Sequence, residues 1–170
     1  MNAKLDSRWL SVDPANKTGL AWWVGQELLA IGTLRKMGSK GKWVGKYSWN
    51  RSVYENEWEA VHDMISQSRQ VIIEEGFGGF AKAVGKQGEY RGFWRAACQA
   101  NGITLTVVNV SEWRRVIKET FNVSWPATTE RKKALAVKLV KEHYRRDVGD
   151  DEADAILLGH AAIRMGLVGG

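Results

Sequence analysis

Hydrophobic and polar positions alternate in three short runs near the start of the chain, a pattern typical of β-strands. The runs predict strands at Arg8–Asp13, Gly19–Val24 and Leu28–Leu34, and the short links between them favour antiparallel pairing. The pattern is lost over Arg35–Arg51, where lysines and arginines are interleaved with aromatic residues and glycines. This segment is interpreted as a basic, aromatic-rich loop or loose hairpin, either a solvated excursion or a nucleic-acid contact.

Strands and helices alternate in the rest of the chain. Short β-branched runs predict buried strands at Arg69–Glu74 and Ile103–Val108, as in a parallel sheet covered on both faces. The first predicted helix is Val53–Ser68, and the second is a helical region that is broken near Gly85–Gly88 and ends at about Asn101, before Gly102 as its C-cap. A short helix capped by Ser111 and a basic helix that begins at Thr128 follow. The last predicted helix runs from Asp150 to about Met165. Three antiparallel strands and then two parallel strands predict one α/β domain over residues 1–170, with a mixed sheet flanked by helices.

Composition favours a polyanionic partner. The net charge is +6 and the sequence pI is about 9.5, which points to nucleic acid, although a merely solubilising surface charge gives the same balance. Cys98 is the only cysteine, so an internal disulfide is excluded and a reducing compartment is expected. No apolar run approaches the ~20 residues that a membrane-spanning helix needs. The protein is therefore expected in the cytoplasm, away from membranes.

Three places combine an acid with an apolar element of the predicted core. Asp13 and Glu74 each end a buried strand, and Asp151 and Asp154 are spaced i, i+3 on one face of the last helix. If the two strands are neighbours, four carboxylates crowd together and repel one another unless divalent cations lie among them. Hard oxygen ligands suit Mg²⁺ or Mn²⁺. Two such ions ~3.5–4 Å apart can activate water and stabilise the leaving oxygen in phosphodiester cleavage.

Each acid also has a structural explanation. Asp13 could initiate a turn before Pro14, and Glu74 could end a strand at its edge, with Glu75 competing for the same role. The acids at 150–152 could simply complement the helix N-terminus. Asp154 is harder to explain in this way, because an apolar run follows it at once and an unpaired carboxylate there is costly.

Four segments match one family in order and in structural context. They are Leu10–Pro14 with Gly19 beyond it, Ile73–Phe77, Gly85–Gly92 and Asp151–Ile156. In these segments the chain resembles the RuvC-like Holliday junction resolvases of the retroviral-integrase/RNase H superfamily. The resemblance implies an RNase H-like fold with a central first strand, beside which lies the strand that carries Glu74.

The resemblance also implies an activity and a set of site residues. It implies a homodimer that binds a four-way DNA junction and makes paired nicks, with two Mg²⁺ ions per active site held by Asp13, Glu74, Asp151 and Asp154. It implies DNA contacts from Phe77, whose alternative is a core phenylalanine, and from basic residues. These are Lys86, Arg91, Lys118, Arg131, Lys132 and Lys133.

Two features depart from the family pattern. His160 lies six residues after Asp154, further than the family's histidine, and is not assigned to catalysis; the segment Arg35–Arg51 is longer than usual. Small divergent members are often encoded by bacteriophages, so a phage origin is one expectation. The alternatives are an RNase H-like nuclease that acts on flaps or RNA–DNA hybrids, a non-catalytic junction-binding module, and a protein-interaction domain with a basic surface.

Overall fold

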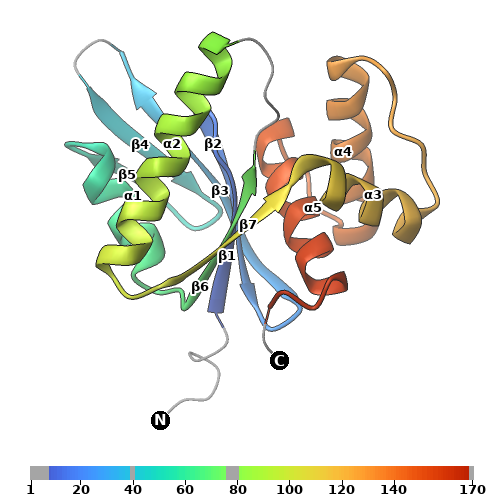
Figure 1. Cartoon of the computed structure of the whole chain (residues 1–170), viewed down its shortest axis with the longest axis horizontal. Coiled ribbons are helices and arrows are strands. Elements are labelled where there is room, and N and C mark those ends of the chain that lie inside the picture. Colours follow the sequence, from blue (N-terminus) through green and yellow to red (C-terminus); the bar gives the residue numbers. More distant parts are fainter. Residues whose placement is uncertain (1–7, 39–40, 76–80, 169–170) are drawn as a thin grey trace.

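A computed structural model describes residues 8–38, 41–75 and 81–168, with the side chains of 81–87 outside the description. One mixed sheet lies between two layers of helices (Figure 1). The strands are β1 (Arg8–Asp13), β2 (Lys17–Val24), β3 (Glu27–Met37), β4 (Lys42–Tyr47), β5 (Arg51–Tyr54), β6 (Gln70–Glu75) and β7 (Thr104–Asn109). The helices are α1 (Glu57–Ile65), α2 (Ala81–Ala100), α3 (Val110–Phe121), α4 (Thr129–Tyr144) and α5 (Asp150–Arg164). Within these ranges no helix is both long and apolar enough to cross a bilayer.

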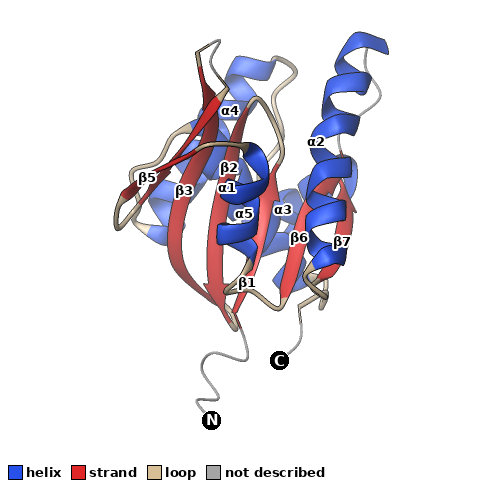
Figure 2. Ribbon diagram, turned by 90° about the vertical axis from the view of Figure 1, so that its left-hand side faces the viewer, coloured by secondary structure: helices blue, strands red, loops and turns tan. Residues whose placement is uncertain are grey.

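The sheet order is β5-β4-β3-β2-β1-β6-β7, so the first strand is central (Figure 2). β1 pairs antiparallel with β2 and parallel with β6, and β6 pairs parallel with β7. The five strands β3-β2-β1-β6-β7 confirm the predicted arrangement of three antiparallel and two parallel strands. Two further strands, β4 and β5, extend the sheet to seven.

β4 lies within the segment Arg35–Arg51 interpreted as a loop or loose hairpin, and β5 begins at its last residue; the loop alternative is wrong and the hairpin alternative is confirmed. β3 continues to Met37, and β4 then pairs with it antiparallel and continues into β5. Trp43 and Val44 are buried, at 6% and 4% exposure, which anchors β4 to the core. The frequent glycines and lysines hid this strand because each lowers strand propensity by itself.

The predicted helix over Val53–Ser68 begins too early. Asn56 caps α1 by accepting a hydrogen bond from the Glu59 amide at 2.9 Å, and residues before it belong to β5. Apolar residues at 53, 58 and 61 satisfy a helical period without belonging to one helix.

Two other predicted helix boundaries need correction, and one is confirmed. α2 runs unbroken through the glycines at 85 and 88, since a helix tolerates such residues at about 1 kcal/mol each. Asn109, rather than Ser111, caps α3: its side chain accepts a hydrogen bond from the Ser111 amide at 2.9 Å. Gly102 ends α2 as expected, with φ +65° and a backbone bond from Ile103 N to Cys98 O at 2.9 Å, a Schellman motif.

Two hydrophobic cores cover the two faces of the sheet. Helices α3, α4 and α5 pack on one face, and α1 and α2 on the other (Figure 1). On the first face, Ser11 Oγ donates to the Ala155 carbonyl at 2.7 Å and accepts from Trp23 Nε1 at 2.9 Å, which ties β1 to α5 and β2. Gly159 lies directly on the Trp23 ring, where a Cβ atom would approach to 2.5 Å. These contacts fix the height of α5 over β1.

Candidate active site

The predicted acids converge at one edge of the sheet. β1 and β6 are parallel neighbours with Val12 opposite Ile73, so the next residues, Asp13 and Glu74, lie side by side where the two strands end. α5 crosses β1 and β2 with Asp151 and Asp154 in its first turns. The structure therefore brings together acids from two strands and one helix that are far apart in the sequence.

Gly19 is what allows α5 to approach so closely. It lies opposite Asp13 in the β1–β2 pair, and a Cβ atom built on it would lie 1.9 Å from the Asp151 carbonyl oxygen. The backbone of α5 thus rests directly on the bare backbone of β2. Any larger residue at this position must push the acids of α5 away from Asp13.

The carboxylates strongly influence one another's ionisation. Burial raises the pKa of Asp13 well above its ordinary value, and the charges of Glu74, Asp154 and Asp151 raise it further. Burial, and then the Glu74 charge, raise the pKa of Asp154 to about 7. The pKa of Glu74 is raised as well, mainly by burial. Crowded carboxylates of this kind are costly to ionise without a nearby cation.

Glu74 and Glu75 point to different surroundings. Trp113 Nε1 donates to Glu74 Oε2 at 2.8 Å, and this bond lowers the Glu74 pKa in opposition to burial. Glu75 is exposed and forms an ion pair with Arg91 at 3.8 Å. Of the two acids, the structure places Glu74 with Asp13.

Three cations border the acids. Lys17 Nζ lies 2.9 Å from Asp151 Oδ2, and Lys133 forms an ion pair with Asp150. Arg114 lowers the pKa of Asp13, Glu74 and Asp154 by its charge. Its guanidinium lies 5.1 Å from the centre of the Trp113 ring and 5.3 Å from that of Trp125.

The carboxylate oxygens of these acids suit a hard divalent cation, but the described side chains are not grouped around one point. Within residues 8–38, 41–75 and 81–168, no three His, Cys, Asp or Glu side chains are grouped so that they could hold a metal ion. Asp151 is instead turned to Lys17. The acids nevertheless supply only carboxylate oxygens. Burial, and then the charges of neighbouring carboxylates, raise the pKa values of Asp13 and Asp154, and a bound divalent cation would lower them.

The predicted DNA-binding residues are spread over several elements. Lys118 on α3 and Arg131 on α4 are exposed, Lys132 on α4 is half-buried, and Lys133 is paired with Asp150. Arg91 on α2 is half-buried beside Glu75. Phe77 lies outside the described residues, as does the side chain of Lys86.

His160 belongs to an aromatic cluster between α3, α4 and α5. Its Nδ1 lies 2.6 Å from the Tyr144 hydroxyl, and its ring lies 4.9 Å from that of Phe121. Its Nε2 is buried without a hydrogen-bond partner among the described residues. Burial lowers the His160 pKa. The ring is thus occupied in the core of this helical layer.

Sequence reasoning missed Lys17, Trp113 and Arg114. Lys17 follows the first strand closely enough to be suspected as a neighbour of Asp13, but its partner Asp151 is over 130 residues away. Trp113 and Arg114 reach the acids only because α3 follows β7 at the sheet edge. A single sequence carries no signal of that proximity.

Replacing Trp113 by phenylalanine should shift the pH dependence of any cleavage that uses Glu74. The lost indole N–H removes a charge-assisted bond of about 1.5–3 kcal/mol that lowers the Glu74 pKa, so the Glu74 pKa rises further. The acidic limb of the pH–rate profile should move to higher pH, with activity recovered at high pH. Trp125→Phe is the control, because that indole donates to the Arg114 carbonyl, at 2.8 Å. Equal shifts in the two variants would contradict the role of Trp113.

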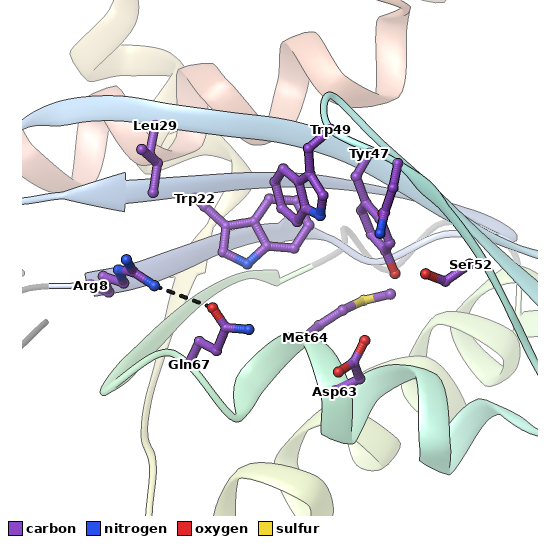
Figure 3. Close-up of a pocket in the computed structure, with 10 residues that line it drawn as sticks. Arg8, Trp22, Leu29, Tyr47, Trp49, Ser52, Asp63, Met64 and Gln67 are labelled. Carbon is purple, nitrogen blue, oxygen red and sulfur yellow. Dashed lines mark hydrogen bonds between the residues drawn. The ribbon is translucent and has the colours of Figure 1, made fainter.

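A separate hollow of about 260 Å³ lies on the other face of the sheet, between α1 and the outer strands. Figure 3 shows Trp22, Trp49 and Tyr47 gathered at its centre, with Arg8 bonded to Gln67 at one side. The Tyr47 and Trp49 rings are stacked at 5.2 Å, and Trp22 meets Trp49 edge-on at 5.2 Å. These rings form an aromatic cluster in which Trp49 remains 57% exposed, and Tyr47 and Trp49 also line a groove that includes Lys17.

Comparison with known proteins rests on structure. No family model matches the sequence, and no curated protein matches it either. The structure of T. thermophilus RuvC in complex with a Holliday junction substrate matches with a TM-score of 0.58 at 14% identity, over 94% of this chain and 96% of that one. The fold is RuvC-like. A second structure, of Thermus thermophilus RuvC alone, matches with a TM-score of 0.52 at 16% identity, again over 94% of this chain and 96% of that one.

The RuvC-like fold confirms the family resemblance at the level of architecture. The match covers 94% of this chain and 96% of the T. thermophilus chain, so the fold is shared over nearly the whole length of both. Sequence identity this low shows the fold alone. Nothing in the comparisons supports the expected bacteriophage origin.

Proposed function

We propose that this protein is a divalent-metal-dependent endonuclease that resolves four-way DNA junctions by paired symmetric nicks. The observation that carries the proposal is the set of acids on β1, β6 and α5, where burial raises the pKa values of Asp13, Glu74 and Asp154 and the charge of Glu74 raises those of Asp13 and Asp154 further. The RuvC-like fold supports it, because the T. thermophilus protein of that fold was solved with a Holliday junction substrate. The basic pI supports a nucleic-acid partner.

In this proposal Asp13, Glu74, Asp151 and Asp154 hold two Mg²⁺ ions, for which Mn²⁺ can substitute. Bound in this way, the ions supply an activated water and charge stabilisation at the scissile phosphate. Trp113 holds the Glu74 carboxylate in place through its 2.8 Å bond. Lys17 must release Asp151 for that carboxylate to turn toward Asp13. Arg114, between two indole rings, lowers the pKa of these acids by its charge and so opposes the effect of burial.

Paired nicking requires two active sites, so the proposal includes a homodimer. A monomer suffices for the alternative nuclease readings, cleavage of a flap or of an RNA–DNA hybrid. The oligomeric state in solution and the symmetry of the cuts therefore separate these readings.

The test is cleavage of labelled synthetic substrates in Mg²⁺: a four-way junction, a linear duplex, a flap and an RNA–DNA hybrid. Symmetric nicks in the junction alone are the expected result. Cleavage of the flap or hybrid instead would retain the metal nuclease and overturn the substrate. Tight junction binding without cleavage under any divalent cation would favour a binding module.

A further inference from the structure

The strands that extend the sheet carry a row of cations on one face. Side chains alternate across a strand, and the cross-strand register places Lys46 of β4 directly opposite Arg51 of β5. On the same face, Arg35 of β3 lies opposite Lys17 of β2. We call Arg35, Lys46 and Arg51 the basic face; it lies on the α5 side of the sheet, next to the acids.

No helix covers this part of the sheet on the α5 side. α5 packs on β1, β2 and β3, and among the described elements it makes no substantial contact with β4 or β5. Val53, on the same side of β5, is 60% exposed. The open space forms a groove of about 830 Å³ between the basic face and the N-terminal end of α5, where Gly149 and Glu152 line it. A neighbouring hollow of about 700 Å³ continues it past Arg145 and Arg146.

The charges of the basic face are not neutralised within the described part of the chain. Arg35 and Lys46 have no carboxylate partner there, and Arg51 reaches only the Met37 sulfur at 3.8 Å. Glu152, the acid in the groove, is already bonded to the Gly149 amide at 2.7 Å. Elsewhere on the hairpin, Lys42 does have a partner, Glu55 at 3.0 Å.

This arrangement has a cost that a polyanion would relieve. Like charges directly opposite each other on two strands are destabilising, yet Lys46 and Arg51 occupy such a pair. The groove also begins at Lys17, which contacts Asp151 of the acidic cluster. A phosphate backbone that enters the active site can therefore continue along the groove without interruption.

We propose that the basic face binds the sugar–phosphate backbone of one duplex arm of the DNA substrate, beyond the phosphate that is cut. This inference rests on the proposed nuclease function and assigns a new part of its substrate site. From Lys17 on β2 to Arg51 on β5, the path along the basic face covers three strand spacings, ~14 Å in all, which equals about four nucleotides along B-DNA. Lys46 and Arg51 contact phosphates on the outer part of this path.

The surface chemistry favours a duplex over a single strand. Single strands are held by aromatic rings with a free face. Val44 and Thr33, both buried, lie between the cations of the basic face. Tyr47 and Trp49 also line the groove; Trp49 is 57% exposed, but one face of each ring is taken up by their mutual stacking at 5.2 Å. Phosphate contacts without base stacking are the mode by which proteins hold duplex backbone.

The test measures junction affinity against salt concentration in the Asp154→Asn background, where no cleavage is expected. Lys46→Gln combined with Arg51→Gln should weaken binding about 10-fold or more at low salt and reduce the slope of log K against log salt by about 2. Lys138→Gln combined with Arg164→Gln removes the same charge from exposed sites on α4 and α5, and should leave the slope unchanged. Lys46→Arg combined with Arg51→Lys keeps both charges and should bind as the parent does.

The outcomes separate this inference from the proposed function. If the parent binds and the wild-type protein cuts the junction, but both neutralised pairs behave alike, the basic face is not a DNA contact and the nuclease proposal stands. If the parent binds no DNA, both proposals fail. A linear duplex should show the same loss as the junction; a loss confined to a single-stranded probe would overturn the duplex assignment. Removing a like-charge pair should not lower Tm. A fall in Tm in the neutralised variant, but not in the charge-conserving variant, would show that its DNA binding is lost through misfolding.

Discussion

Asp154→Asn should abolish cleavage and, without divalent cations, raise the thermal stability of the protein. Burial and the Glu74 charge raise the pKa of Asp154 from 3.8 to about 7, so the ionised group costs about 4 kcal/mol of folding free energy above neutral pH. Asparagine removes this cost together with a metal ligand. At ~2–4 °C per kcal/mol for a chain of this size, Tm should rise by roughly 10 °C at pH 8.

The increase in stability from Asp154→Asn should be larger at high pH than at low pH. Because the folded state holds the Asp154 proton more tightly than the unfolded chain, wild-type stability falls as pH rises from the ordinary pKa of 3.8 to about 7. The variant should therefore differ little from wild type below about pH 4 and most above pH 7. Mg²⁺ should raise the Tm of the wild type most at high pH, and should leave the variant almost unchanged.

Asp150→Asn is the matched control, in the first turn of the same helix. The bond from Lys133 lowers the Asp150 pKa, so neutralising this acid should leave Tm unchanged or lower it slightly. Differential scanning at pH 5, 7 and 8 would measure both variants. A loss of stability in Asp154→Asn, or a gain of equal size in Asp150→Asn, would contradict the electrostatic account of the cluster.

Gly19→Ala should damage both folding and cleavage although it adds a single methyl group. The new Cβ atom would lie 1.9 Å from the Asp151 carbonyl oxygen, so α5 must move by more than 1 Å from β2. Overpacking of this kind costs about 1–3 kcal/mol, which lowers Tm by roughly 2–12 °C. A displacement of ~1 Å at catalytic groups typically costs 100-fold in rate, so cleavage at permissive temperature should fall by about that factor.

Gly88→Ala provides the comparison for this substitution. A Cβ atom there meets nothing within 4 Å, and alanine within a helix gains about 1 kcal/mol over glycine. Its Tm should be equal to or above that of the wild type. If Gly19→Ala were equally well tolerated in stability and rate, the close approach of α5 to β2 would not control the site.

The central part of the fold was predictable because its signals are local. Arg8–Asp13 is a strand with the predicted bounds, since apolar residues fill it and Pro14 ends it. Thr128 caps α4 as expected, its side chain accepting from the Arg131 amide. The β4–β5 extension was not recognised, because Trp43 is buried on the face that α1 and α2 cover and Val44 on the opposite face, a tertiary effect that glycine-rich local sequence conceals.

The acids of the site were predictable from their positions, whereas their surroundings were not. Asp13 and Glu74 lie at the ends of buried strands, and Asp154 lies on an apolar helix. An unpaired carboxylate is energetically costly at such positions. The choice of Glu74 over Glu75 depends on which way β6 turns its side chains toward Trp113. That distinction, like the Lys17–Asp151 pair, appears only when distant elements are packed together.

The most direct test of the metal-nuclease proposal is cleavage of a four-way junction by wild type and by Asp13→Asn, with Mg²⁺ and with EDTA, at equal amounts of bound DNA. Asp13 is the acid on which Glu74, Asp154 and Asp151 all act, so the account predicts cleavage by the wild type in Mg²⁺ only. It predicts none by Asp13→Asn, which should bind the junction as well as the wild type or better, because one negative charge facing the phosphates is gone. Cleavage by Asp13→Asn at the wild-type rate, or undiminished wild-type cleavage in EDTA, would contradict the account.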